Sequence, residues 1–232
     1  MQKTYNNKLV IAAVVAILTI ALVSVVPVAY KAYMTPGVKT EGITVEGAKN
    51  ASTDFNGNWT VTKAAPGNPT SVGYTFWEIL PGERRATSGS TKDASGDVAI
   101  ENGKLTKANI TIDMATIETD RQKRDINVRM KLLETDSYPT ATFVADENAN
   151  VDVSHIPENA SIGQVTVPGT LTIHGVSKHI DAKLDVLRTG ENLVVGAAIP
   201  INRLDYGVET PDFVAAKIDA EGHLNIRLAL EK

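Results

Sequence analysis

Histidine is the residue of this chain that a metal site or an acid–base catalyst would use first. The histidines are His155, His174, His179 and His223, and no pair has an H-x-x-x-H or H-E-x-x-H spacing. A turn could bring His174 and His179 together, but the sequence indicates no third ligand, and zinc needs at least three from the protein. We therefore expect no metal site.

Carboxylates and nucleophiles give no stronger indication of catalysis. Glu118, Asp120, Asp125 and Asp136 cluster near a predicted helix, where a solvated surface explains them without a substrate. The chain has no cysteine, which excludes thiol nucleophiles, disulfides and zinc–thiolate sites, and it has no G-x-S-x-G motif. We expect a protein that is not an enzyme.

The N-terminal region contains a long hydrophobic run. Residues 9–26 read LVIAAVVAILTIALVSVV, in which only Thr19 and Ser24 are polar, and the run continues to residue 29. A helix of roughly 20 mostly apolar residues can cross a bilayer. We expect a cytoplasmic tail over 1–8 and a single transmembrane signal anchor over 9–29.

A cleaved signal peptide is the alternative interpretation of this run. Such peptides have apolar regions of only about 7–15 residues. Cleavage after Ala29 or Ala32 would also place Pro27 or Tyr30 where a small residue is expected. An uncleaved anchor fits the sequence better.

Charge predicts the orientation of this anchor and excludes one class of partner. Lys3, Lys8 and the α-amino group hold the tail in the cytoplasm, so the domain lies on the extracytoplasmic side of the cytoplasmic membrane. Residues 1–34 contain three lysines and no acid, so the remainder holds 20 basic and 27 acidic residues, a charge of −7. No nucleic-acid partner is expected.

Residues 30–57 are rich in glycine and lack periodicity, which predicts a flexible linker.

From residue 58 to residue 232, apolar and polar residues alternate with the period of two that half-buried strands require. Turn signals such as Asn102-Gly103 and Glu221-Gly222 separate the alternating segments. Closure into a barrel removes exposed sheet edges, so we favour a barrel over a sandwich.

One segment has a helical pattern. Ile126, Met130 and Leu133 recur at i, i+4 and i+7 within residues 120–133, which predicts a short helix that caps the barrel. Its basic residues could face anionic lipid headgroups, or they form a solvated face paired with Asp120 and Asp125.

Three motifs then occur in order. They are T-x-x-x-x-R-D beginning at Thr119, YPTATF over 138–143 and GTLTIHGV over 169–176. Together they resemble the YceI-like family of exported lipid-binding proteins, over roughly residues 58–232. The resemblance implies an all-β fold, an eight-stranded antiparallel lipocalin-like barrel whose apolar pore holds a polyisoprenoid or another long-chain amphiphile. We expect no cofactor other than such a bound isoprenoid lipid or quinone. Family members often have a cleaved signal, so the anchor departs from that pattern and implies lipid capture near the membrane surface.

Such a ligand needs only an apolar lining, because burial of hydrocarbon supplies the affinity. The inward-facing candidates for this lining, each of which plain core packing would also explain, are Phe76, Ile110, Ile112, Met114, Phe143, Leu171, Ile173, Leu184, Val186 and Ile199. Tyr74, Trp77 and Tyr206 are candidates for the pore mouth, where an amphipathic ring meets both lipid and water.

Three functions remain open on the sequence. A lipid-binding carrier, store or sensor at the membrane face is the first. The second is a membrane-anchored interaction module with a filled barrel. The third is an enzyme acting inside the barrel, which would need an inward polar or titrating residue that does not stand out. A flat apolar rim around the pore would favour a homodimer.

Overall fold

The computed structural model describes residues 11–21, 23, 37–80, 83–147, 149–210 and 217–232. The chain divides into two compact units, residues 1–35 and 36–232. In the first unit, residues 11–21 and 23 are helical. The predicted tail over 1–8, and residues 9, 10, 22 and 24–29 of the predicted anchor, lie outside the described residues. Among the residues that are described, no helix has both the length and the apolarity that crossing a membrane requires.

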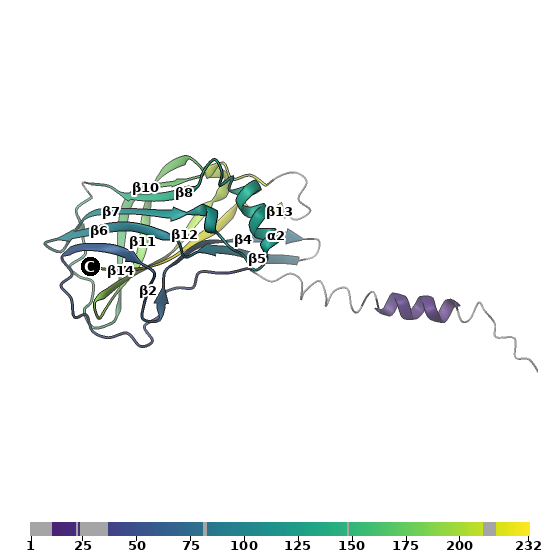
Figure 1. The fold of residues 1–232 in the computed structure, drawn as a ribbon, viewed down its shortest axis with the longest axis horizontal. Coiled ribbons are helices and arrows are strands. Elements are labelled where there is room, and N and C mark those ends of the chain that lie inside the picture. Colours follow the sequence, from purple (N-terminus) through teal and green to yellow (C-terminus); the bar gives the residue numbers. More distant parts are fainter. Residues whose placement is uncertain (1–10, 22, 24–36, 81–82, 148, 211–216) are drawn as a thin grey trace, which may run out of the picture. The chain divides into compact units, whose positions relative to one another are not determined.

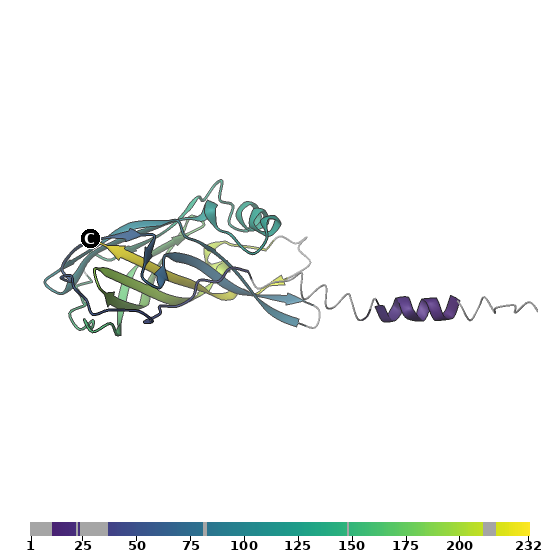
Figure 2. The same cartoon turned by 60° about the horizontal axis from the view of Figure 1, so that its bottom comes forward.

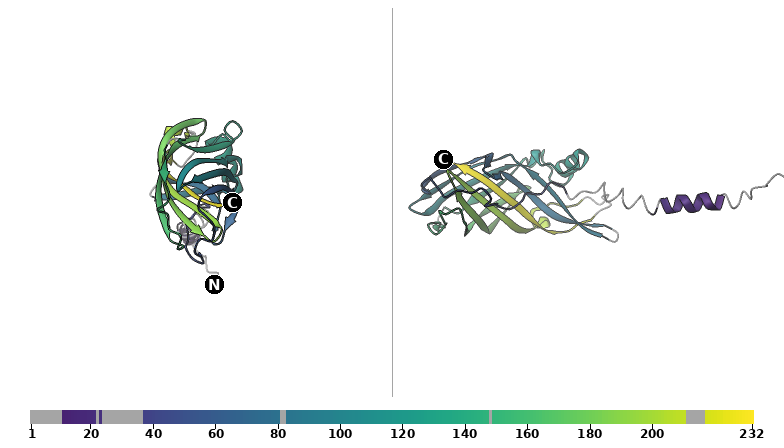
Figure 3. Two further views of the ribbon diagram at one scale, coloured as in Figure 1. Left: turned by 90° about the vertical axis from the view of Figure 1, so that its left-hand side faces the viewer. Right: turned by 90° about the horizontal axis from the view of Figure 1, so that it is seen from below.

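The second unit is a closed antiparallel barrel with one short helical region, as the sequence predicted (Figure 1). Eight strands form the ring in the order β1, β6, β7, β8, β10, β11, β12 and β14, and β14 returns to β1. Seen from one end, these strands surround a common axis (Figure 3, left). The strands are β1 (Gly57–Thr62), β2 (Ala64–Ala65), β3 (Asn68–Pro69), β4 (Ser71–Leu80), β5 (Glu83–Thr91), β6 (Ala94–Glu101), β7 (Lys104–Asp113), β8 (Thr140–Ala145), β9 (Val151–Asp152), β10 (Ile162–Ile173), β11 (Val176–Thr189), β12 (Asn192–Asn202), β13 (Lys217–Ile218) and β14 (Glu221–Glu231).

The two ends of the barrel are built differently because two strands share one edge of β14. Near the C-terminus of β14, β1 occupies that edge, with Thr60 opposite Glu231. Toward the start of β14, β4 takes over, with Val72 opposite Ile226. The small β2–β3 hairpin separates the two, and β4 then continues into a long hairpin with β5 (Figure 2).

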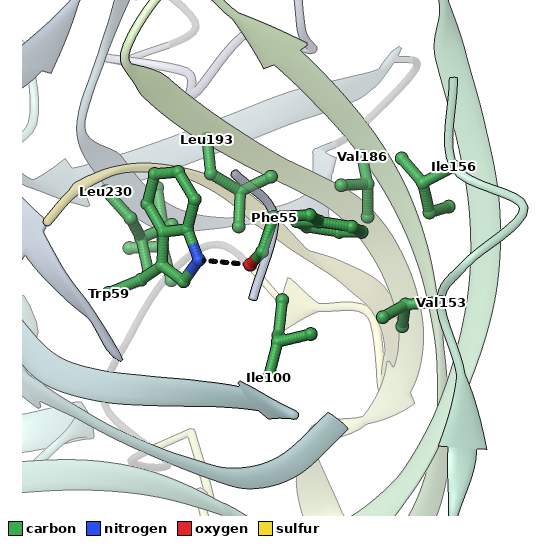
Figure 4. Close-up of a cluster of buried hydrophobic side chains, with 9 residues drawn as sticks. Phe55, Trp59, Ile100, Val153, Ile156, Val186, Leu193 and Leu230 are labelled. Carbon is green, nitrogen blue, oxygen red and sulfur yellow. Dashed lines mark hydrogen bonds between the residues drawn. The ribbon is translucent and has the colours of Figure 1, made fainter. Parts of the chain in front are cut away.

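One end of the barrel is filled by a hydrophobic cluster around Phe55 and Trp59 (Figure 4). The Trp59 indole Nε1 donates a hydrogen bond to the Phe55 carbonyl oxygen at 2.9 Å, so this buried polar group is satisfied. Leu228 and Leu230, from the end of β14, belong to the same cluster. Leu224, from its start, packs in a second cluster at the other end.

The flexible linker predicted over 30–57 is wrong for residues 37–57, which pack on the barrel and belong to its compact unit. The Thr40 hydroxyl is hydrogen-bonded to that of Ser71 at 2.7 Å, and both side chains are buried. Asn68 donates to the Thr44 carbonyl oxygen and accepts from its N–H. Glycine content misled the prediction, because these polar and backbone contacts have no periodic sequence signature. Residues 30–36 lie outside the described part.

The predicted helix over 120–133 is an α-helix, α2 (Gln122–Asn127), followed by a π-helical turn, η2 (Val128–Leu132). The expected buried stripe is also displaced. Ile126 and Met130 are 49% and 55% exposed, whereas Val128 is buried. The wider π turn changes which side chains face the barrel, and a 3.6-residue period cannot anticipate this change. Two short 3₁₀ helices, η1 (Met114–Thr116) and η3 (Arg203–Tyr206), follow β7 and β12.

Candidate lipid-binding pore

The barrel encloses an elongated apolar cavity, here called the pore, with a volume of about 210 Å³. Strands around the whole ring supply its wall. Apart from Thr142, Arg203, Tyr74 and Tyr206, every lining residue has an apolar side chain or is glycine. Alternation produces this wall because every second residue of each strand points inward. A wall of this composition can hold a hydrocarbon chain but offers almost nothing to a polar ligand.

All ten residues predicted as lining lie in the pore wall. Ile110 and Ile112 come from β7, and Leu184 and Val186 from β11, so opposite sides of the ring contribute. Whether these side chains contact a ligand stays a prediction. The full set is Phe76, Ile110, Ile112, Met114, Phe143, Leu171, Ile173, Leu184, Val186 and Ile199.

A second cavity, here called the mouth cavity, has a volume of about 370 Å³. Its wall is formed by residues of α2 and η2, such as Arg124 and Leu132, and of the β4–β5 hairpin, such as Glu78 and Thr87. Its lining includes Glu78, Arg124, Lys131 and Thr210, so it is more polar than the pore. Five residues line both cavities, which shows that the two adjoin: Tyr74, Phe76, Leu133, Arg203 and Val208.

The three residues predicted for the mouth occupy different positions. Tyr74 lies at the junction of the two cavities, as a mouth residue should. Tyr206 is only 3% exposed and lines the pore. Trp77 lines neither cavity, and its ring lies 4.9 Å from the Arg84 guanidinium carbon. Neighbouring strand residues point to opposite faces, so Phe76 lines the pore and Trp77 cannot.

The sequence motifs hold the wall and the mouth together. The Thr119 backbone N–H and hydroxyl both donate to Asp125 Oδ1 at 2.6 Å, which ties the start of α2 to the preceding chain. The Tyr138 ring lies 4.3 Å from the His174 ring, so two motifs meet at the β10–β11 turn. A Cβ at Gly169 would lie 2.5 Å from the Val144 carbonyl oxygen, so only glycine fits there.

The histidines do not assemble into a reactive site. His179 Nε2 lies 2.8 Å from Asp146 Oδ2 on the exposed surface, and this hydrogen bond raises the pKa of His179. His174 Nε2 is buried without a hydrogen-bond partner and lies 3.7 Å from Glu134 Oε2. Among the described residues, no group of three histidine, aspartate or glutamate side chains could hold a metal ion.

Sequence reasoning left out many of the residues that line these cavities, and two examples show why. Leu224, Ile226, Leu228 and Leu230 of β14 line the pore, and their alternation could have identified them. Arg203 lies in the walls of both cavities and is 9% exposed. No local pattern marks it, because its position depends on where η3 folds over the end of the barrel.

Comparisons with known proteins agree with this geometry. BcnA of Burkholderia cenocepacia is 22% identical, with 69% of this chain and 94% of that chain covered and a TM-score of 0.54. A polyisoprenoid binding domain from Saccharophagus degradans, implicated in plant cell wall breakdown, is 21% identical, with 75% and 97% covered and a TM-score of 0.56. At these identities the likeness establishes the fold.

A curated relative and a family model address the sequence itself. The UPF0312 protein plu2095 of Photorhabdus laumondii is 27% identical over 107 residues, which are 45% of this chain. The chain spans about half the length of that relative, 50%. The model of the YceI-like domain matches residues 59–230, which include nearly all of the barrel. The chain therefore belongs to the YceI-like domain family.

Proposed function

We propose that the barrel binds a long-chain isoprenoid or a similar amphiphilic lipid in the pore. The apolar wall of the pore carries this proposal. An isoprenoid chain has no hydrogen-bonding group, so its burial at about 25 cal/mol per Å² requires no polar partner. The polyisoprenoid binding domain of Saccharophagus degradans, which has the same fold, supports the ligand class.

A filled barrel that serves only as an interaction module is the competing function. That function would leave no continuous space between the inward side chains. The pore instead extends between Phe55 near one end and Tyr74 at the mouth cavity. This space favours a ligand-binding barrel, in which the lipid is carried, stored or sensed.

We also propose that the protein acts at the outer face of the cytoplasmic membrane, held by the hydrophobic run over 9–29. The sequence of this run and its flanking lysines support the proposal. In the described part, the Thr19 hydroxyl donates to the Val15 carbonyl oxygen at 2.8 Å, which would satisfy this polar group in lipid.

Organic extraction and mass spectrometry of purified residues 36–232 would test lipid binding. This part contains every strand and hydrophobic core cluster of the described residues, so it can fold alone. We expect a near-stoichiometric long-chain lipid. An empty extract, together with failure to bind added isoprenoid quinone, would reject lipid binding and favour the interaction module.

The location needs a separate experiment on intact cells. In cells whose outer envelope layers have been removed but whose cytoplasmic membrane is intact, added protease should degrade the barrel domain while a cytoplasmic marker protein survives. The full chain should sediment with membranes. Recovery of the full chain in the soluble fraction would reject the anchor. Because lipid binding is measured on residues 36–232, each proposal can fail without the other.

A further inference from the structure

A short segment before the first strand crosses one end of the barrel. This segment, residues 51–56, is here called the strap. Near its start, the Ser52 N–H donates to the Gly190 carbonyl oxygen at 2.9 Å, in the β11–β12 turn. At its end, Asn56 Oδ1 accepts from the Gly103 N–H at 2.8 Å, in the β6–β7 turn. Four strands of the ring separate these two turns in either direction, so the strap spans the barrel end from side to side.

Phe55 points from the strap into the barrel. Its side chain is 8% exposed and lines the pore. It packs between Ile100 of β6 and Val186 of β11, which also line the pore (Figure 4). Trp59 packs in the same cluster but is not among the described residues that line the pore. The Phe55 ring is therefore part of the inner surface at this end of the pore.

The other side of the Phe55 ring meets a charged group. The guanidinium carbon of Arg188 lies 4.5 Å from the ring centroid. Arg188 is 7% exposed, and its guanidinium donates to Glu158 Oε1 at 3.0 Å and to the Thr53 carbonyl oxygen at 3.4 Å. It is not among the described residues that line the pore. A hydrocarbon chain that passed the ring would have to displace this hydrogen-bonded cation, which is costly because a buried charge needs its partners.

We propose that Phe55 is the floor of the pore and sets the length of the longest lipid tail that the protein holds. This inference rests on the proposed function and specifies the ligand by its length. Because the strap closes this end, a lipid enters from the other end and its tail stops against Phe55. The strap precedes the residues that match the YceI-like domain, 59–230, so the matched domain does not itself supply this floor.

The size of the floor predicts the size of the effect. Phe55→Ala removes a ring of six carbon atoms, and one isoprene unit has five. The variant should therefore admit a tail longer by about one isoprene unit. Arg188 still lies beyond the new space and limits the gain to that unit. A tail that is longer still must leave hydrocarbon in water or overpack the pore, and both weaken binding.

Competition between tails of different length tests the proposal. Lipid-depleted residues 36–232 are mixed in detergent micelles with equal amounts of all-trans isoprenols, from farnesol upward in steps of one isoprene unit. Mass spectrometry of the reisolated protein then gives the bound amount of each. We expect one preferred length in the unchanged protein. In Phe55→Ala the maximum should move up by about one unit, with the longer isoprenol enriched at least roughly tenfold over its shorter neighbour relative to the unchanged protein.

Phe143→Ala is the matched control. It removes the same ring from β8, in the side wall of the pore. The added space lies beside the tail, so affinity should fall while the preferred length stays the same. An equal shift in both variants would show that total volume sets the length, which would overturn the proposal. An unmoved maximum in Phe55→Ala would overturn it as well. If the unchanged protein binds no isoprenol, the proposed function itself fails.

A second variant covers the case in which Phe55→Ala does not fold. Phe55→Leu keeps an apolar side chain in the cluster and removes only part of the volume. The preference should shift in the same direction by a smaller amount, a several-fold rise in the ratio of the longer isoprenol to the preferred one. A ratio that is unchanged or lowered in Phe55→Leu would contradict the assignment of Phe55 as the floor.

Discussion

Filling the pore with a larger side chain should increase the stability of the folded protein and at the same time decrease its affinity for a lipid ligand. Ala141 on β8 lines the pore opposite Ile112 of β7, and its side chain is 9% exposed. Ala141→Leu adds three carbon atoms that would occupy empty space in the absence of lipid. Atoms that line a cavity lack van der Waals partners on one side. The added carbon atoms supply these partners, so they contribute both hydrophobic burial and dispersion energy to folding.

The magnitude follows from the added methylene groups. Three of them, at about 0.8 kcal/mol each, contribute about 2.4 kcal/mol. The leucine side chain loses about 0.5–1 kcal/mol of rotamer entropy, so about 1.5 kcal/mol of added stability remains. For a domain of this size, that gain raises Tm by roughly 3–6 °C. A bound lipid is displaced from the same volume, so its binding free energy is weakened by about 2.4 kcal/mol, which raises Kd about 50-fold.

The assay is thermal unfolding of lipid-free residues 36–232, paired with titration of a fixed isoprenoid. Ala198→Leu, the same chemical change on the exposed face of β12, is the control and should alter neither quantity. In a filled barrel, Ala141→Leu would overpack the core and cost about 1–3 kcal/mol. A lowered Tm with unchanged lipid affinity would therefore refute the reasoning.

Three further predictions concern the frame around the pore. Gly169→Ala should lower the free energy of unfolding, measured by urea denaturation, by at least about 2 kcal/mol, because the added Cβ has no room. Gly42→Ala is the control and should have little effect, because a Cβ there would meet nothing within 4 Å. Thr119→Val should cost about 1–3 kcal/mol by the same measurement, because the buried Asp125 loses a donor. Asp146→Asn should return the pKa of His179 to its ordinary range in an NMR titration. Because the pKa of His179 is raised in the folded state, the contribution of the His179–Asp146 pair to stability is complete below the pKa of the unfolded state and is lost as pH rises through the pKa of the folded state. If His179 has the same pKa in Asp146→Asn as in the unchanged protein, this reasoning is contradicted.

The barrel and its apolar wall could be predicted because alternation is a local property. Residues such as Ile110 and Ile112 mark their own inward face, and neighbouring motifs indicated the family. The same rule separates Phe76, which lines the pore, from Trp77, which does not. Alternation therefore identified the wall but could not measure the space that it encloses.

The remaining features depend on contacts between distant parts of the chain. Residues 37–57 look like a linker because their partners, such as Ser71 and Asn68, lie elsewhere in the sequence. Ile126 and Met130 are exposed because a π turn follows α2, and no apolar period predicts that turn. Arg203 resembles any other arginine until η3 folds over the barrel end.

The position of β14 affects how the protein folds during synthesis. This strand is bordered by β12 on one side and by β4 and β1 on the other, so the ring lacks one member until residues 221–231 are made. The β1–β14 contact joins Thr60 to Glu231, a long loop to close, and such nonlocal pairing is slow. Until then β1 and β12 expose unpaired edges and the apolar lining contacts water. A ribosome-bound chain should therefore depend on chaperones until its last strand emerges, and only afterwards become resistant to proteolysis.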